Sequence, residues 1–204
     1  MFESFKRGTN AIVKFVNRAG VNSNRAVAAL APQEERLCFL SSVRFCASQG
    51  YSLSPFSEAS QRLNKTRFLT LPKGMSFRQA DKKDVAIYDM NADAFINPVV
   101  APQNLEIHKL VYRNTENKAV LLCHPKWAFL HFARKRDLDF SDFPALEKQI
   151  GSYAVCEAED LPRFLPTCAL VFINNIGALS MGETLAQALE RIELLEWICW
   201  QNQS

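Results

Sequence analysis

Two short, uninterrupted apolar runs constrain the fold of this chain more than any other feature. Residues 119–123 read Ala-Val-Leu-Leu-Cys, and residues 169–173 read Ala-Leu-Val-Phe-Ile. A strand that is apolar at every position is typical of strands buried on both faces of a sheet. His124-Pro125 ends the first run, because proline cannot continue a central ladder. The sequence therefore predicts two central strands.

Helical and further strand patterns surround these two runs. A helix is expected to begin at Pro32, which suits a first helical position, and to stop at Gly50. Thr184 is a good N-cap for the last helix. The other predicted helices cover 105–113 and 127–135, and the other predicted strands cover 66–71, 85–88 and 178–181, the last as a hairpin partner of 169–173. Strands and helices therefore mix without strict alternation, as in an α/β protein.

Composition points to one soluble globular domain. The chain has 204 residues, of which 48% are hydrophobic and 22% charged. No apolar run approaches the ~18 residues that cross a bilayer, and no secretory signal is visible, so a cytoplasmic protein is expected. The six cysteines form no C-x-x-C pair, and we expect them to be reduced and packed as small apolar side chains.

The net charge of +3 is concentrated near the N-terminus. Residues 1–30 carry five basic side chains against Glu3, while the rest of the chain is nearly neutral, so nucleic-acid binding is not expected. Residues 2–18 can form an amphipathic helix. We predict a basic N-terminal arm over 1–30 that packs on a neighbouring subunit. A membrane-surface helix, a poorly ordered tail and an organelle transit peptide are the alternatives.

Four stretches carry a resemblance to a known family, and two earlier loops support it. They are Asn104 to Tyr112, Ala119 to Pro125, Asn174 to Leu179, and Gly182 to Glu196. The earlier loops are Ser57 to Arg62 and Leu71 to Gly74. In this order and spacing they resemble the class II aldolase and adducin family over residues ~33–201.

The resemblance implies an α/β/α sandwich around a mostly antiparallel sheet, with the domain spanning 31–204. Family members that cleave sugar phosphates are usually cyclic homotetramers with active sites at subunit interfaces. A homo-oligomer, with the tetramer as its family form, is therefore the expected partner arrangement. Such enzymes hold zinc with three histidines and use a glutamate as acid and base.

At these positions the sequence departs from the family pattern. The first two zinc histidines fall on Leu122 and His124, and the third falls on Ile176. Leucine and isoleucine have no electron pair to donate, and a single histidine cannot hold zinc tightly. The catalytic glutamate falls on Asn104, whose amide exchanges no proton near neutral pH. Glu106 lies two residues along the helix, about 200° away, and is expected to face the opposite side.

The phosphate pocket of the family is changed as well. Its asparagine and two serines fall on Glu58, Pro102 and Gln103, of which the first repels phosphate and the second lacks an N–H. An anion could still be held by Lys73 and Gly74. Candidate ligand-binding residues, carried over from the resemblance, are Ser60, Arg62, Lys73 and Gly74.

The remaining polar residues have structural interpretations. We expect His108 to be hydrogen-bonded inside the fold and His131 to be packed in a helix. His124 is either structural or part of a new metal set with His108, His131 or Cys123. A Cys123/His124 nucleophile lacks an acid partner and an oxyanion motif.

Three functions compete at this stage. The absence of the family's glutamate at Asn104 and of its histidines at Leu122 and Ile176 favours a non-catalytic protein that acts through binding or assembly. Its expected ligand is a small molecule or a protein, and no cofactor is expected. The alternative is a divergent aldolase, epimerase or dehydratase with a relocated zinc site. It predicts a well-formed pocket near His124 with perturbed carboxylates. A membrane-peripheral role through residues 1–18 is the third hypothesis.

Overall fold

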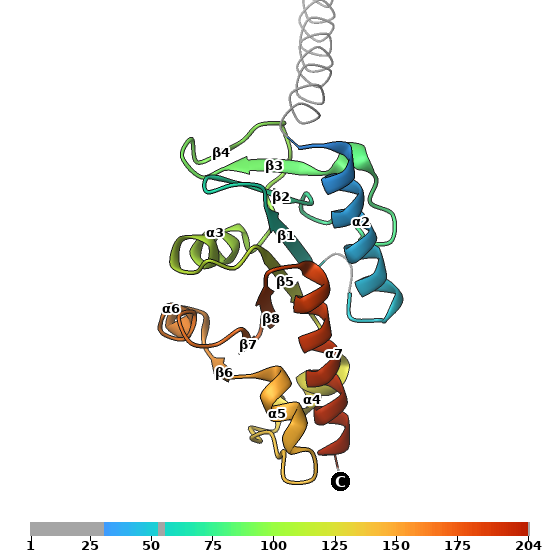
Figure 1. Cartoon of the computed structure of the whole chain (residues 1–204), viewed down its shortest axis with the longest axis vertical. Coiled ribbons are helices and arrows are strands. Elements are labelled where there is room, and N and C mark those ends of the chain that lie inside the picture. The colour runs from blue at the N-terminus through green and yellow to red at the C-terminus, as the bar shows by residue number, and fades with distance from the viewer. Residues whose placement is uncertain (1–30, 53–55, 204) are drawn as a thin grey trace, which may run out of the picture.

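The computed structural model describes residues 31–52 and 56–203 (Figure 1). The predictions for the arm at 1–30 fall outside these residues. Among the helices that are described, none is long and apolar enough to cross a membrane.

The described residues form one eight-stranded sheet, in the order β4-β3-β2-β1-β5-β8-β7-β6. Within this described sheet the β6–β7 pair is parallel, and the other neighbouring strands pair antiparallel. The strands are β1 (Glu58–Arg62), β2 (Arg67–Thr70), β3 (Ala86–Asp89), β4 (Ala94–Phe95), β5 (Ala119–Cys123), β6 (Tyr153–Cys156), β7 (Leu170–Ile173) and β8 (Gly177–Gly182). The mostly antiparallel sheet predicted from the resemblance is confirmed.

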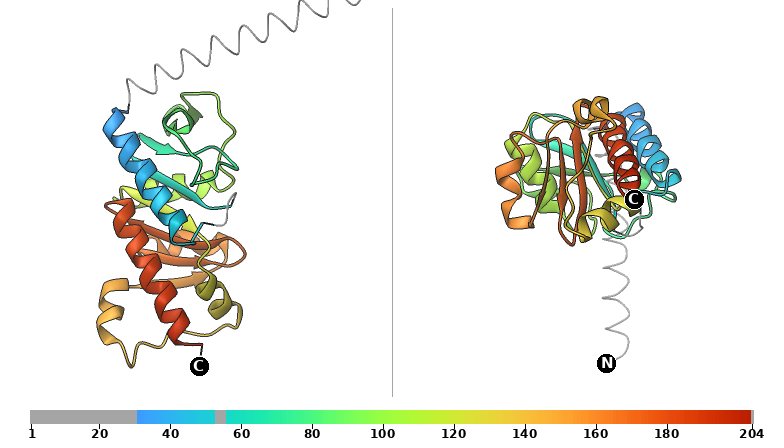
Figure 2. Two further views of the ribbon diagram at one scale, coloured as in Figure 1. Left: turned by 90° about the vertical axis from the view of Figure 1, so that its right-hand side faces the viewer. Right: turned by 90° about the horizontal axis from the view of Figure 1, so that it is seen from below.

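Helices cover both faces of this sheet (Figures 1 and 2). On one face lie α2 (Gln33–Ser48), α4 (Lys126–Ala133), α5 (Pro144–Ile150) and α7 (Leu185–Gln201), and on the other lie α3 (Leu105–Asn114) and α6 (Leu161–Phe164). Short 3-10 turns complete the chain at η1 (Lys82–Asp84) and η2 (Ala158–Asp160). The α/β/α sandwich is therefore confirmed.

Strand β5 shows why two helical layers are needed. Its five residues are all buried, and they alternate between the two cores. Leu121 and Cys123 join the core under α2 and α7, whereas Val120 and Leu122 join the core under α3. Successive side chains on a strand point to opposite faces, so an apolar run exposes no face to water.

Local signals placed the start of α7 correctly and the start of α2 one residue too early. Thr184 caps α7, with its hydroxyl accepting a hydrogen bond from Gln187 N at 3.1 Å. Pro32, predicted as the first residue of α2, is instead the residue before that helix. The stretch from Ser57 to Arg62, matched to a family loop, is mostly strand β1. It pairs with β2 and β5, which supplies partners for its backbone groups.

Sequence patterns predicted no element over 136–168, where the structure has α5, β6, η2 and α6. These elements have seven, four, three and four residues. Shortness alone does not explain the omission, because β2, β3 and β7 also have four residues each and were predicted. The parallel pairing of β6 with β7 comes from tertiary contacts rather than from a local turn.

Candidate functional site

A small cavity of about 170 Å³ opens where β5 ends and where the β7–β8 turn meets the start of α3. Three of the positions that were singled out from the sequence meet there, namely Asn104, His124 and Ile176. The remaining lining residues are Phe56, Gln103 and Asn175. Leu122, Ser60, Arg62, Lys73 and Gly74 do not line the cavity.

His124 is held in place from several sides. Its Nδ1 lies 3.3 Å from Ser57 Oγ, its ring stacks on Phe129 at 5.5 Å, and Phe56 meets it edge-on. Burial lowers the pKa of His124, and this outweighs the opposing effects of the Ile176 backbone and of Glu58. Burial therefore favours the neutral imidazole of His124, whose Nδ1 faces Ser57 Oγ and whose ring also bonds the Ile176 backbone.

The turn beside His124 requires a glycine at its end. Gly177 has φ +145°, and a Cβ there would lie 2.6 Å from the backbone oxygen of Cys123. Any side chain would push β8 away from β5 at the point where His124 leaves the sheet. The glycine thus keeps the cavity wall close to the imidazole.

Leu122 and Ile176, which the resemblance assigns to the other zinc positions, do not suit a metal ion. Leu122 is fully buried in the core under α3, Ile176 packs against that core, and neither side chain has a donor atom. Within the described ranges, no three or more His, Cys, Asp or Glu side chains are grouped to share a metal ion. The donor set therefore does not fit zinc, which needs at least three protein ligands in catalytic sites.

Among the described residues that line the cavity, no carboxylate replaces the catalytic glutamate of the family. Asn104 precedes α3 as its N-cap residue and makes no side-chain capping bond. Glu106 does not line the cavity, because its carboxylate turns to Lys109, whose Nζ lies 2.7 Å away. The expectation that Glu106 faces elsewhere agrees with this position.

The carboxylate of Glu58 caps the start of α3. Both carboxylate oxygens accept a hydrogen bond from Asn104 N, each at 3.1 Å, and the residue is 8% exposed. A carboxylate at a helix N-terminus is stabilised by the free N–H groups and by the helix dipole. Sequence reasoning matched Glu58 to a phosphate-contacting position but missed its role as the cap of α3. Glu58 thus places a negative charge of its own at that position.

A buried polar network lies beneath Glu58. Ser60 Oγ is 2.7 Å from His108 Nδ1 and 2.8 Å from the Tyr112 hydroxyl. His108 is fully buried, and its Nε2 lies 3.3 Å from Glu58 Oε2 without forming a hydrogen bond. The expectation that His108 is hydrogen-bonded inside the fold is confirmed. Ser60 is fully buried too, and this favours a structural role; ligand binding by Ser60 stays a prediction.

Arg62 and the turn at Lys73 lie away from the cavity. Arg62 donates to the backbone oxygens of Tyr112, Thr115 and Asn117 at 2.7, 3.1 and 3.2 Å, which joins β1 to the end of α3. Lys73 and Gly74 form an exposed turn in which Gly74 has φ +77°. The N–H of Lys73 already donates to Val100 O at 3.0 Å. Anion binding by these residues stays a prediction.

Among the described residues, neither the Cys123/His124 nucleophile pair nor a metal set around His124 is assembled. Cys123 lies in the core under α2 and α7, on the sheet face opposite Leu122, and burial raises the pKa of its thiol well above the usual value. His131 is buried, with its Nε2 3.1 Å from Asp137 O, as expected for a packed helix residue. A Cys123/His124 nucleophile pair is therefore disfavoured.

The comparison with protein families decides the identity of this fold. The sequence profile of the Class II Aldolase and Adducin N-terminal domain matches residues 40–202. The chain belongs to the class II aldolase and adducin family. Among curated protein sequences none matches the chain.

Solved structures of class II aldolase family members show the same fold. YgbL from Klebsiella pneumoniae aligns with a TM-score of 0.73 at 18% identity, covering 83% of this chain and 88% of that protein. L-fuculose 1-phosphate aldolase from Glaciozyma antarctica PI12 aligns with a TM-score of 0.70 at 18% identity, covering 80% of this chain and 69% of the enzyme. The Thermus thermophilus enzyme of the same name aligns with a TM-score of 0.66 at 19% identity, covering 81% of this chain and 91% of that enzyme. At these identities the likeness concerns the fold.

The lowered pKa of His124 makes a testable contribution to stability. A histidine whose folded pKa lies below the unfolded value near 6.5 contributes fully above that value, and the contribution is lost as pH falls from 6.5 through the lowered pKa. We expect the wild type to lose more free energy of unfolding between pH 7.5 and 5.5 than the His124→Gln variant does. Urea unfolding at the two pH values measures this difference, and equal losses would contradict it.

Proposed function

We propose that this class II aldolase-fold protein acts through binding or assembly and does not perform zinc-dependent aldol cleavage. One observation carries the proposal: of the positions that hold zinc in the family, only His124 offers an electron pair, because Leu122 and Ile176 carry hydrocarbon side chains. A zinc ion stabilises the enediolate when a class II aldolase breaks the carbon–carbon bond. Without three ligands that stabilisation is absent.

Two further features support the same conclusion. Asn104 cannot exchange a proton in place of a carboxyl group, and Glu58 sets a buried negative charge at the start of α3. A sugar phosphate would have to place its own charge near that carboxylate. At about 170 Å³ the His124 cavity is also smaller than the ~300 Å³ at which ligand pockets usually begin. The amide at Asn104, the charge of Glu58 and the small cavity all favour a site that does not cleave sugar phosphates.

The biological setting of this role is part of the proposal. We place the protein in the cytoplasm as a homo-oligomer, with a tetramer as the family form and with a small molecule or a protein as its ligand. The near-neutral body of the chain favours neither nucleic acid nor a membrane surface as a partner.

Metal content and cleavage activity test the proposal together. The purified chain, incubated with zinc and desalted, is expected to retain far less than one zinc ion per chain by mass spectrometry. It is also expected to release no dihydroxyacetone phosphate from L-fuculose 1-phosphate in a coupled assay. The G. antarctica aldolase, treated in the same way, serves as the positive control. Stoichiometric zinc that is lost in a His124→Ala variant would overturn the proposal.

A divergent enzyme of the same family is the second candidate, favoured by the cavity itself. A neutral imidazole with amide side chains beside it could accept a proton from a small substrate. Of the described residues that line the cavity, however, none is a carboxylate. Turnover of a small sugar acid or sugar phosphate that disappears in the His124→Gln variant would favour this alternative.

A further inference from the structure

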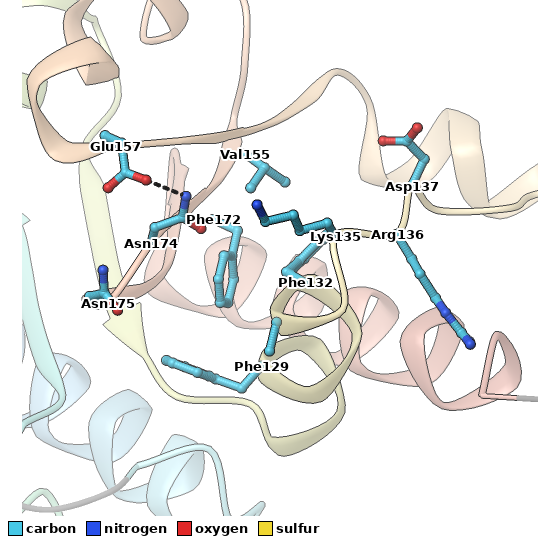
Figure 3. A pocket seen from close by; sticks show the side chains of 11 residues that line it. Phe129, Phe132, Lys135, Arg136, Asp137, Val155, Glu157, Phe172, Asn174 and Asn175 are labelled. Atoms are coloured by element: carbon cyan, nitrogen blue, oxygen red, sulfur yellow. Dashed lines mark hydrogen bonds between the residues drawn. The ribbon is translucent and has the colours of Figure 1, made fainter.

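A second and larger cavity, of about 510 Å³, lies on the other side of the β7–β8 turn (Figure 3). Its size falls within the ~300–1,000 Å³ range of small-molecule sites. Residues of α4, of the segment after α4, of β6 and of β7 surround it. Asn175 borders both this cavity and the His124 cavity, so the two lie side by side.

Aromatic and aliphatic side chains form the floor of this cavity. Phe172 lies edge-on to Phe129 at 5.0 Å and is tilted against Phe132 at 4.7 Å. Val155 pairs with Phe172 across the β6–β7 ladder and is 39% exposed. Val155 lies on β6, the last strand of the described sheet, and lines the cavity together with residues of α4. The floor is therefore apolar, with Val155 as its exposed part, whereas Phe132 and Phe172 are 6% and 5% exposed.

Lys135 places a positive charge over this floor. Its backbone has φ +53°, a conformation that favours glycine, two residues after α4 ends. The side chain points into the cavity that Val155 and Phe172 also line (Figure 3). Within the described part of the chain, no salt bridge engages Lys135.

The other charged residues of the lining are engaged or turned away. Arg136 donates to Asn202 O at 3.3 Å, and its guanidinium points away from the cavity, as does the carboxylate of Asp137 (Figure 3). Glu157 accepts a hydrogen bond from Asn174 Nδ2 at 2.7 Å. Lys135 is thus the lining cation that faces the cavity, while Asn174 and Asn175 supply amide groups at its edge.

We propose that this cavity binds a small organic anion with an apolar body, such as an aromatic carboxylate. The hydrocarbon part would pack on Val155 and the half-buried Phe129, the carboxylate would pair with the Lys135 ammonium, and the amides would offer hydrogen bonds. The site is separate from the His124 cavity, so it stands whether or not the chain has any catalytic activity.

Binding of 2-naphthoate and of its neutral counterpart 2-naphthamide tests the site, with isothermal titration calorimetry as the measurement. We expect the wild type to bind naphthoate about fivefold more tightly than naphthamide, as expected for one partly exposed charge pair. Lys135→Gln removes this difference. Arg136→Gln, a neighbouring change of the same charge, keeps it within about twofold. Val155→Glu weakens naphthoate binding by at least about fivefold through repulsion and loss of the floor.

Several results would overturn the proposal. They are equal binding of the two probes to the wild type, no binding of either at about 1 mM, and equal losses in Lys135→Gln and Arg136→Gln, which would indicate only diffuse attraction. A drop in oligomeric state for Val155→Glu by sedimentation would show that a second copy of the chain occupies this face instead. All three substituted side chains are wholly or partly exposed, and circular dichroism checks that each variant folds.

Discussion

Leu122→His is expected to lower the free energy of unfolding by about 4 kcal/mol, although the resemblance assigns a zinc histidine to this position. Leu122 is fully buried among apolar side chains under α3. Removing it forfeits ~1.5–3 kcal/mol of hydrophobic stabilisation. Burying an imidazole without partners costs a further ~1–3 kcal/mol. For a domain of this size, the melting temperature should fall by about 12 °C.

Ile176→His is the matched control for this change. Ile176 is half-buried and lines the open His124 cavity, so a histidine there can turn to water. We expect a loss of less than about 1 kcal/mol. Urea unfolding of both variants with and without a chelator measures the two losses. Losses of equal size would show that Leu122 is not enclosed as described.

Glu58→Ala is expected to destabilise the fold by about 3 kcal/mol. The carboxylate accepts from Asn104 N through both oxygens at the start of α3, in a buried setting. A hydrogen bond to a charged group contributes ~1.5–3 kcal/mol, and a carboxylate at a helix N-terminus contributes ~0.3–1 kcal/mol more. Asn104 N would also lose its acceptor inside the protein. Chemical unfolding followed by circular dichroism measures the change.

Two variants separate this capping role from general effects of charge. Glu58→Gln keeps one acceptor oxygen and should cost about 1 kcal/mol. Glu106→Ala removes a carboxylate that is 76% exposed in its side chain and pairs with Lys109, so we expect about 0.5 kcal/mol. If Glu58→Ala were as mild as Glu106→Ala, Glu58 would not be the cap of α3.

Apolar patterning predicted the central elements because nearly every buried position in them carries an apolar side chain. Strand β5 begins and ends where the run 119–123 does, and the helix that Thr184 caps follows its apolar repeat. The elements β6 and α6 were not predicted in this way. The pairing of β6 with β7, between segments that are apart in the chain, decides where that strand lies.

Some residues of the candidate site were likewise placed from the sequence, and others only by packing. The order of short motifs along the chain was enough to place Asn104, His124 and Ile176 around one cavity. The mutual positions of Glu58, Ser60 and His108 came from packing, because β1 and α3 are separate elements that only the folded sheet brings together. The same holds for Lys135, whose unusual backbone angle has no signature in the sequence.

The sequence by itself determined the family and the sandwich, since these depend on residue type and order, and it placed hydrocarbon side chains at two of the three positions that the resemblance assigns to a metal. The tertiary structure alone decided which polar groups are already bonded to one another, that Glu58 caps α3, and that an apolar cavity under the Lys135 ammonium lies beside the His124 cavity. Hydrogen bonds and cavities depend on distances between residues far apart in the chain, and no local pattern encodes those distances.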